Sequence, residues 1–512
     1  MKVAFGRGAL IRSALIVTGA TSVSYITGLA ISMLVARGLG PADYGRYSYV
    51  VWLSGILVVC CTNGLTTTGI KFIAECLGRD DDEGARRVYG LLRRYFVVSL
   101  VAVALGFMLV ARFVLPDGWE GGVVLLIVVV LAGSLPKALY LLHSSMAKGY
   151  GNFSIEANTT NILGVAGLLA TIGLVATRQP LDAYLFLFVL LSMGHAVLTL
   201  GFIHRAGIGP SPGAIEPVIA ARLHRHLAWT VVLVLLATVS NRSIETFLLN
   251  RTAGAEAVGF FIIAATLVRG GADLLANGLS AVLIPAMAHS YGRDGESGIG
   301  VILSGAVRYF LFLGLLLAGV GVACADLAIG LMYGPKFQPV IPVFRAMVMV
   351  AGLVLMEGAF NALLATTDRQ RLRVLLTLVA VAVTAALAFA LVPRHGLAGA
   401  VATHVIARVV MFVAIMFTAT RIVRLNLPWA GFARLLGCAA IAAAAAALAW
   451  WAAGAGVARD VAATLVYAVA LVACSFLLKA WSAQDLEMLS RLATRYPAIG
   501  RIASMLSGIG AR

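Results

Sequence analysis

The fold of this chain is indicated by two similar segments, RGLGPADYG at residues 37–45 and RTAGAEAVG at residues 251–259. The arginine and the glycines at the fourth and ninth positions agree between the two segments, which start 214 positions apart (251 minus 37). The same offset aligns NGL at 63–65 with 277–279, GRD at 78–80 with 292–294, and RYF at 94–96 with 308–310. Because these matches cluster and need no gap, they indicate an internal duplication.

Long apolar runs continue from this unit toward the end of the chain. Hydrophobic residues make up 61% of the sequence and charged residues 12%, whereas soluble domains carry about 25% charged residues. Each run has about the 20 residues that a helix needs to cross the hydrocarbon core of a bilayer. We therefore predict an all-α integral membrane protein with about 14 transmembrane helices. The first run, 13–36, is longer than the apolar region of a signal peptide and is predicted to be an uncleaved span.

The duplication predicts how the helices are organised. With six crossings in each copy, both copies enter the membrane from the same side and are related by a pseudo-twofold axis along the membrane normal. Two such lobes would surround a central cavity, as alternating access requires. The predicted divisions are an N-lobe at 1–205, a cytoplasmic linker at 206–226, a C-lobe at 227–425, two further helices at 426–478 and a cytoplasmic amphipathic tail at 479–512.

The formal net charge of +17 is explained by membrane topology. Arginines concentrate in alternate connections, within 79–94, 205–225, 369–373 and 421–434, and are sparse in the connections between them. The positive-inside rule places the arginine-rich side and both termini in the cytoplasm. No basic stripe with interleaved aromatic residues lies on a soluble segment, so no nucleic-acid partner is predicted.

Basic residues within the spans are the main candidates for a binding site. We predict that five of them line the cavity: Lys137, Arg242, Arg269, Arg345 and Arg408. A charge at the bilayer centre costs at least about 2.5–3.5 kcal/mol on insertion scales, so each needs water or a counter-ion. Lys137 and Arg408 have no carboxylate within one turn of their own helices and are the strongest candidates. For Arg345, near a span end, snorkelling to the headgroups is the alternative.

Three carboxylates also fall within spans: Glu245, Asp273 and Glu357. They are candidates for ion coupling, because intramembrane carboxylates commonly mark ion pathways. A structural alternative stays open for two of them. Asp273 follows Arg269 by four residues and Glu245 follows Arg242 by three, spacings that allow neutralising pairs on one helical face.

Polar side chains on the first and seventh spans are also predicted to line the cavity, among them Tyr25 and Asn241. Hydrogen bonding between helices is the alternative. The six cysteines and the intramembrane histidines lack the spacing of a metal or redox site, so no metal is predicted. No G-x-x-x-x-G-K-[ST] motif occurs, so a gradient has to drive transport, and no cofactor or catalytic residue is predicted.

Three segments resemble a known family. GLGPADYGRYS at 38–48 and NGLTTTGIKFIAE at 63–75 resemble the start of Wzx-type polysaccharide biosynthesis flippases, and RTAGAEAVGFFIIAATLV at 251–268 resembles their seventh-to-eighth helix turn. These flippases belong to the multidrug/oligosaccharidyl-lipid/polysaccharide exporter superfamily. The resemblance implies transfer of an undecaprenyl-pyrophosphate-linked oligosaccharide across a bacterial inner membrane, with the pyrophosphate held by cavity cations. Whether the protein works alone or beside a polysaccharide polymerase and a chain-length regulator stays open.

Other functions remain open at this point. A cation-coupled multidrug exporter would need a cavity dominated by carboxylates, whereas cations outnumber carboxylates within these spans. A peptidoglycan-precursor flippase of the same superfamily would differ only in the sugar carried. A membrane glycan polymerase would need a substantial outer domain, and the predicted outer connections are short.

Overall fold

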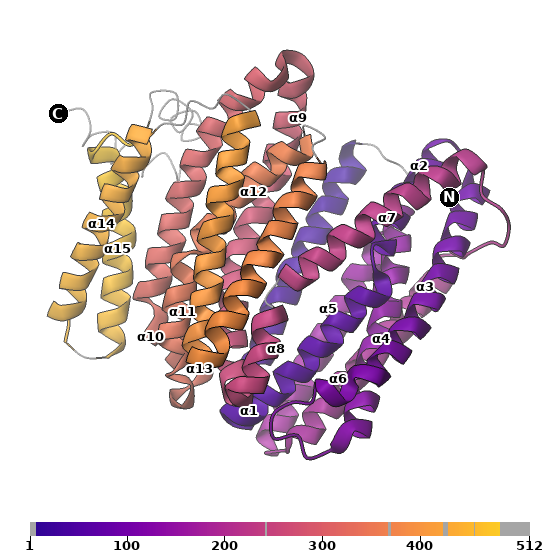
Figure 1. The fold of residues 1–512 in the computed structure, drawn as a ribbon, viewed down its shortest axis with the longest axis horizontal. Coiled ribbons are helices and arrows are strands. Elements are labelled where there is room, and N and C mark those ends of the chain that lie inside the picture. Colours follow the sequence, from indigo (N-terminus) through magenta and orange to yellow (C-terminus); the bar gives the residue numbers. More distant parts are fainter. Residues whose placement is uncertain (1–6, 241–242, 367–369, 423–428, 455, 482–512) are drawn as a thin grey trace. The chain divides into compact units, whose positions relative to one another are not determined.

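The computed structural model describes residues 7–240, 243–366, 370–422, 429–454 and 456–481, and these residues form helices and connections without a β-strand (Figure 1). The first helices are α1 (Arg7–Thr62), α2 (Leu65–Gly78), α3 (Asp82–Val110), α4 (Gly122–Gly149), α5 (Ser154–Ala176), α6 (Leu181–Arg205), α7 (Pro217–Ser240) and α8 (Ser243–Thr252). They are followed by α9 (Gly254–Ala323), α10 (Ala325–Tyr333), α11 (Val340–Met349), α12 (Ala351–Thr366), α13 (Gln370–Ile422), α14 (Trp429–Ala452) and α15 (Val457–Leu477). Two short 3₁₀ turns lie at Ala111–Phe113 and Pro335–Phe337.

Twelve helical segments in the described part of the chain are long and apolar enough to cross a membrane. Two of them, in α1 and α13, contain a residue with non-helical backbone angles and therefore hold two predicted spans each. The all-helical membrane fold with about 14 spans is thus confirmed. At 70 residues and 1.5 Å per residue, α9 is far longer than a bilayer is thick, and Figure 1 shows its ribbon turning back on itself.

The break in α1 lies in the GLGP segment that begins the repeat. Gly40 has φ 77°, a left-handed conformation that costs a glycine little, and Pro41 follows it without an amide proton to donate. The chain therefore turns at this point within α1 and begins the second span. A second break, Asn63 and Gly64 with φ 28° and 77°, separates α1 from the short helix α2.

The chain packs as two compact units, residues 1–262 with 384–400, and residues 263–383 with 401–512. In the first unit, α2, α3, α4 and α7 share a core that includes Phe72, Tyr89, Leu142 and Leu223. Phe72 is only 1% exposed, so α2 is held by its apolar face and presents its opposite face outward. The domain boundaries predicted from the repeat remain a prediction.

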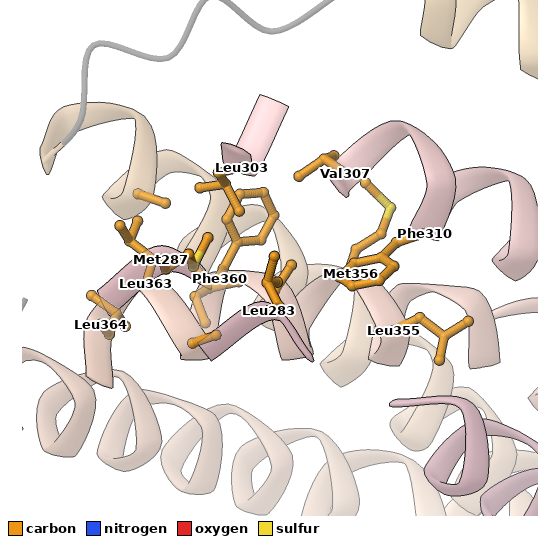
Figure 2. Packing of buried hydrophobic residues seen from close by; sticks show 14 of the residues in the cluster. Leu283, Met287, Leu303, Val307, Phe310, Leu355, Met356, Phe360, Leu363 and Leu364 are labelled. Atoms are coloured by element: carbon orange, nitrogen blue, oxygen red, sulfur yellow. The ribbon is translucent and has the colours of Figure 1, made fainter. Parts of the chain in front are cut away.

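In the second unit, α9, α12 and α13 surround a core in which Leu303 and Phe360 are fully buried (Figure 2). Two further helices, α14 and α15, pack against α9 in the same unit. Gly319 allows this approach, because a Cβ there would lie 1.8 Å from the ring of Tyr467, whose hydroxyl donates to the Leu315 carbonyl at 2.9 Å.

The C-terminal tail begins with a docked segment. Trp481 donates its indole N–H to Ser475 Oγ at 2.9 Å and packs on Tyr309 and Phe312. Arg434 donates to the Lys479 carbonyl at 2.8 Å. The amphipathic helix predicted for 479–512 lies, from 482 onward, outside the described residues.

Candidate functional site

Lys137 lies in the middle of α4 and faces other helices of the first unit. Its Nζ is 4.7 Å from the ring centre of Tyr140, one turn further along α4. The Tyr140 hydroxyl is 3.1 Å from Thr160 Oγ1 on α5. Thr160 donates its single hydroxyl proton to the Glu156 carbonyl at 2.7 Å, so Tyr140 is the donor to Thr160. The ring is therefore held between α4 and α5 with its face available to the ammonium.

His195 on α6 completes this cluster. Its ring centre is 5.0 Å from that of Tyr140, in an edge-to-face arrangement. Its Nδ1 lies 2.7 Å from the Leu191 carbonyl, and because a carbonyl only accepts, Nδ1 carries the proton. The second nitrogen, Nε2, remains for a ligand or a proton. Sequence reasoning missed Tyr140 and Thr160, which carry no charge pattern, and their approach depends on how α4 packs on α5.

No carboxylate contacts Lys137 in the part of the chain that the structure describes. The acidic residues of α1, α4, α5 and α6 are Asp43, Glu156 and Asp182. Asp43 pairs with Arg46, Glu156 pairs with Lys148, and Asp182 is exposed in the first turn of α6. An intramembrane ammonium without a carboxylate needs an anion from elsewhere or water, so this cluster is suited to bind an anionic ligand.

Arg408 has a carboxylate partner on another helix, which the residue spacing within α13 could not indicate. Its Nη1 lies 3.2 Å from Glu357 Oε2 on α12, and the two side chains are 30% and 13% exposed. The other oxygen, Glu357 Oε1, is buried without a hydrogen-bond partner among the described residues. The pairing joins positions 51 residues apart, which helical spacing cannot reveal. Arg408 is therefore a partly neutralised cation, and binding an anion there would compete with Glu357.

The pair is expected to behave as one unit when either residue is replaced. Glu357→Gln or Arg408→Gln alone should lower the thermal unfolding temperature, because each leaves a charge without its partner in a largely buried site. The double variant should recover part of the loss, with a coupling energy of about 1 kcal/mol or more. Thermal unfolding of the purified protein in detergent measures all four forms. Additive losses would show that the two charges do not interact.

Arg345 on α11 is also paired. Its guanidinium contacts the carboxylate of Asp326 on α10 and donates through Nε to the Val322 carbonyl at 3.3 Å. It lines one side of a cavity of about 560 Å³, whose walls are mostly small side chains of α9, α14 and α15, among them Ala318, Ala443 and Ala447. Snorkelling alone therefore does not describe Arg345, which has a fixed acidic partner.

The structure gives the exposure of three of the remaining predicted residues. Arg269 is exposed on α9, Glu245 is 2% exposed on α8, and Tyr25 is half-buried on α1. Asn241 and Arg242 lie outside the described residues, as does the side chain of Asp273. The proposed pairs Arg242–Glu245 and Arg269–Asp273 therefore stay predictions.

A hydrogen-bonded closure joins the two copies of the repeat on the predicted outer side. Asn250 on α8 donates to the Leu115 carbonyl at 2.8 Å and accepts from the Asp117 backbone N–H at 2.9 Å. Asp117 in turn accepts from the backbone N–H of Ala255 through Oδ2 at 3.3 Å and from Arg46 Nε through its carbonyl at 3.1 Å. The connection after α3 is thus held on the ends of α8 and α9.

Glycines that are equivalent in the repeat meet beneath this closure. A Cβ on Gly45 would lie 1.8 Å from the Ala255 carbonyl oxygen, and one on Gly259 would lie 3.2 Å from the Gly45 Cα. Gly45 and Gly259 are the ninth residues of the two segments that define the duplication. Both glycines lie in the first unit, so equivalent residues of the duplicated segment contact each other there. These glycines permit backbone contact at the point where the copies touch.

These features define a class: a polytopic helical membrane protein in which charged and polar clusters lie inside compact helical units. Solved structures with the same fold include one described as "Lipid II flippase MurJ, inward closed conformation" (TM-score 0.72, 13% identity, covering 90% of this chain and 97% of that chain). Another is an inward-facing multidrug resistance MATE family transporter of the MOP superfamily (TM-score 0.64, 15% identity, covering 78% and 95%). A third is a MOP superfamily transporter from Pyrococcus furiosus whose description reports a binding pocket of reversed polarity (TM-score 0.56, 15% identity, covering 80% and 95%). At these identities the likeness is one of fold.

The family follows from the sequence itself. Residues 10–290, more than half of the chain, match the model of the polysaccharide biosynthesis protein family, and the chain belongs to this family. No curated protein sequence matches the chain. The family resemblance predicted from three short segments is therefore confirmed, and the fold is shared with the solved structures named above.

Proposed function

We propose that this protein is a flippase that moves an undecaprenyl-pyrophosphate-linked oligosaccharide from the cytoplasmic to the outer leaflet. The observation that carries the proposal is Lys137, an intramembrane cation with no carboxylate contact among the described residues. Membership of the polysaccharide biosynthesis family supports the sugar-linked cargo, and the fold supports transport. A diphosphate supplies the negative charge that this ammonium lacks.

The other predicted residues take part in the same proposal. Arg242, Arg269, Arg345 and Arg408 are proposed to meet the diphosphate at other stages of its passage. Glu357, together with Glu245 and Asp273, is a candidate for ion coupling, since anion binding at Arg408 would release the Glu357 carboxylate to bind a proton. The proposed location is the bacterial inner membrane with both termini in the cytoplasm, beside a polymerase and a chain-length regulator.

The membrane potential can supply work for this transfer. A diphosphate leaves the negative side of the membrane as it moves outward, and each elementary charge that crosses gains about 2.3 kcal/mol per 100 mV. No P-loop occurs in the sequence, so the proposal includes no nucleotide hydrolysis by a P-loop of this chain.

Reconstitution tests the proposal directly. The purified protein is placed in vesicles that carry a fluorescent undecaprenyl-diphosphate oligosaccharide in the inner leaflet, and a quencher or glycosidase outside reports its arrival. Transfer should need both the protein and the diphosphate, and undecaprenyl monophosphate saccharide should move poorly. A protein that moved no polyprenyl-diphosphate saccharide would contradict the proposal.

The same reconstituted vesicles test two alternative functions. Lipid II in place of the oligosaccharide tests a peptidoglycan-precursor flippase, and a cationic dye tests a multidrug exporter. The absence of a carboxylate contact at Lys137 among the described residues weighs against the dye, because a cation would be repelled there. Faster transfer of lipid II than of any oligosaccharide carrier would favour the precursor flippase.

A further inference from the structure

Basic residues line the seam between α2 and α7 at one-turn intervals. Lys71 and Glu75 are four residues apart on α2, and Arg79, four residues further on, directly follows the last residue of that helix. On α7, Arg222 and His226 have the same spacing. Residues four apart lie above one another on a helix, so each helix presents a row of side chains to the other.

Glu75 holds the two arginines of this seam. Arg222 donates through both terminal nitrogens to the two oxygens of Glu75, at 2.7 and 3.2 Å, and Arg79 contacts the same carboxylate from one turn along α2. The arginine side chains are 46% and 50% exposed, whereas Glu75 is 23% exposed. The carboxylate is thus covered, while part of each guanidinium faces outward with donors to spare.

Phe72 brings the remaining basic groups to the same place. From the centre of its ring, Lys71 Nζ is 5.4 Å away, Arg222 Cζ is 5.9 Å away and the His226 ring centre is 5.8 Å away. Phe72 is buried, so the groups gather around a fixed ring. We call Lys71, Glu75, Arg79, Arg222 and His226 the basic seam. It contains three permanent cations and one carboxylate.

We propose that the basic seam is a docking site for the diphosphate of the lipid-linked substrate before transport, an inference that rests on the proposed function. Topology alone requires positive charge on this side of the membrane, but it does not require cations of two helices to converge on one ring. Two half-exposed guanidiniums, oriented by one carboxylate, keep N–H donors that Glu75 does not use and that can bind phosphate oxygens, and Lys71 adds a third charge. The seam lies near the cytoplasmic end of the α7 span, at the predicted depth of lipid phosphates.

Binding of inorganic diphosphate to the full-length purified protein, measured by isothermal titration calorimetry, tests the site. Lys71→Gln with Arg222→Gln should weaken binding about tenfold or more, because two charge-assisted contacts are lost. The matched control is Arg421→Gln, which removes an exposed arginine stacked on one ring, Phe417, at 4.9 Å. Its binding should stay within about twofold of the wild type. Unchanged binding in the double variant would overturn the proposal.

The variant Glu75→Gln distinguishes two roles of the basic seam, binding an anion or holding α2 and α7 together by ion pairs as a clamp. It breaks the same ion pairs but removes the competing carboxylate, so diphosphate binding should tighten about threefold. Weakening equal to that of the double variant would show a clamp and overturn the proposal. Vesicles of phosphatidylglycerol serve as a second probe, and if the double variant lost only vesicle binding, the seam would be a lipid-surface contact instead.

Transport measurements connect the seam to the proposed function. In the reconstituted system, the double variant should raise the substrate density that gives half the maximal rate and leave the maximal rate within about twofold. A fall in the maximal rate alone would place the seam in a later step and overturn the docking role. If the wild type bound diphosphate through the seam but moved no lipid, the proposed function would fail while the site itself stood.

Discussion

Gly45→Ala is expected to reduce transport by at least about tenfold, although alanine is normally the better helix former by about 1 kcal/mol. The new Cβ would lie 1.8 Å from the Ala255 carbonyl oxygen, and the obstacle is backbone, which cannot turn aside as a side chain does. The start of α9 must then move away from Gly45 within the first unit, on the predicted outer side. A transporter that cannot close there loses one of the two states that it needs.

Hydrogen–deuterium exchange of residues 111–121 measures this separation. In the wild type, the Asp117 amide is bonded to the Asn250 side chain, so it should exchange slowly. It should exchange at least about tenfold faster in Gly45→Ala. Asn250→Ala removes the acceptor itself, so the Asp117 amide should exchange at least as fast there, with only partial loss of transport. Gly55→Ala is the control on the same helix, because a Cβ on Gly55 would have no atom within 4 Å. Normal exchange and transport in Gly45→Ala would show that the glycine contact is not needed for closure.

Lys137→Gln should have opposite effects on stability and on transport. Removing a charge that has no carboxylate contact in the described residues relieves its desolvation, so the unfolding temperature should rise or stay unchanged. Transport of the diphosphate-linked substrate should nevertheless fall by at least about tenfold, the value of one lost charge-assisted contact. Lys137→Arg keeps the charge and should retain part of the activity. Thermal unfolding and the vesicle assay give the two readouts.

Lys148→Gln is the matched control on the same helix. Lys148 is ion-paired with Glu156 at the end of α4, so its replacement should cost some stability and leave transport within about twofold. If Lys137→Gln lowered stability and transport together, Lys137 would be a structural cation. Its assignment as a substrate contact would then have to be withdrawn.

Charge partners across helices could not be predicted from the sequence. Arg408 and Lys137 had the same local pattern, each without a carboxylate on its own helix. Only packing distinguishes them. Glu357 on α12 pairs with Arg408, whereas Lys137 lies over Tyr140 of its own helix, whose ring is held by Thr160 on α5 and His195 on α6. The basic seam could not be predicted for the same reason. Its two rows of residues lie about 150 positions apart in the sequence, and each row alone indicates only a cytoplasmic connection under the positive-inside rule.

The sequence by itself determined the membrane-spanning helical class, the duplication and the family, because hydropathy and repeated turn residues are local and linear properties of a chain. The tertiary structure was needed to show that Arg408 pairs with Glu357, that Lys137 has no carboxylate contact among the described residues, and that Gly45 meets Gly259. The physical reason is that a charge in a low-dielectric medium is governed by whatever lies within a few ångströms of it. In a bundle of long helices, those neighbours come from other helices.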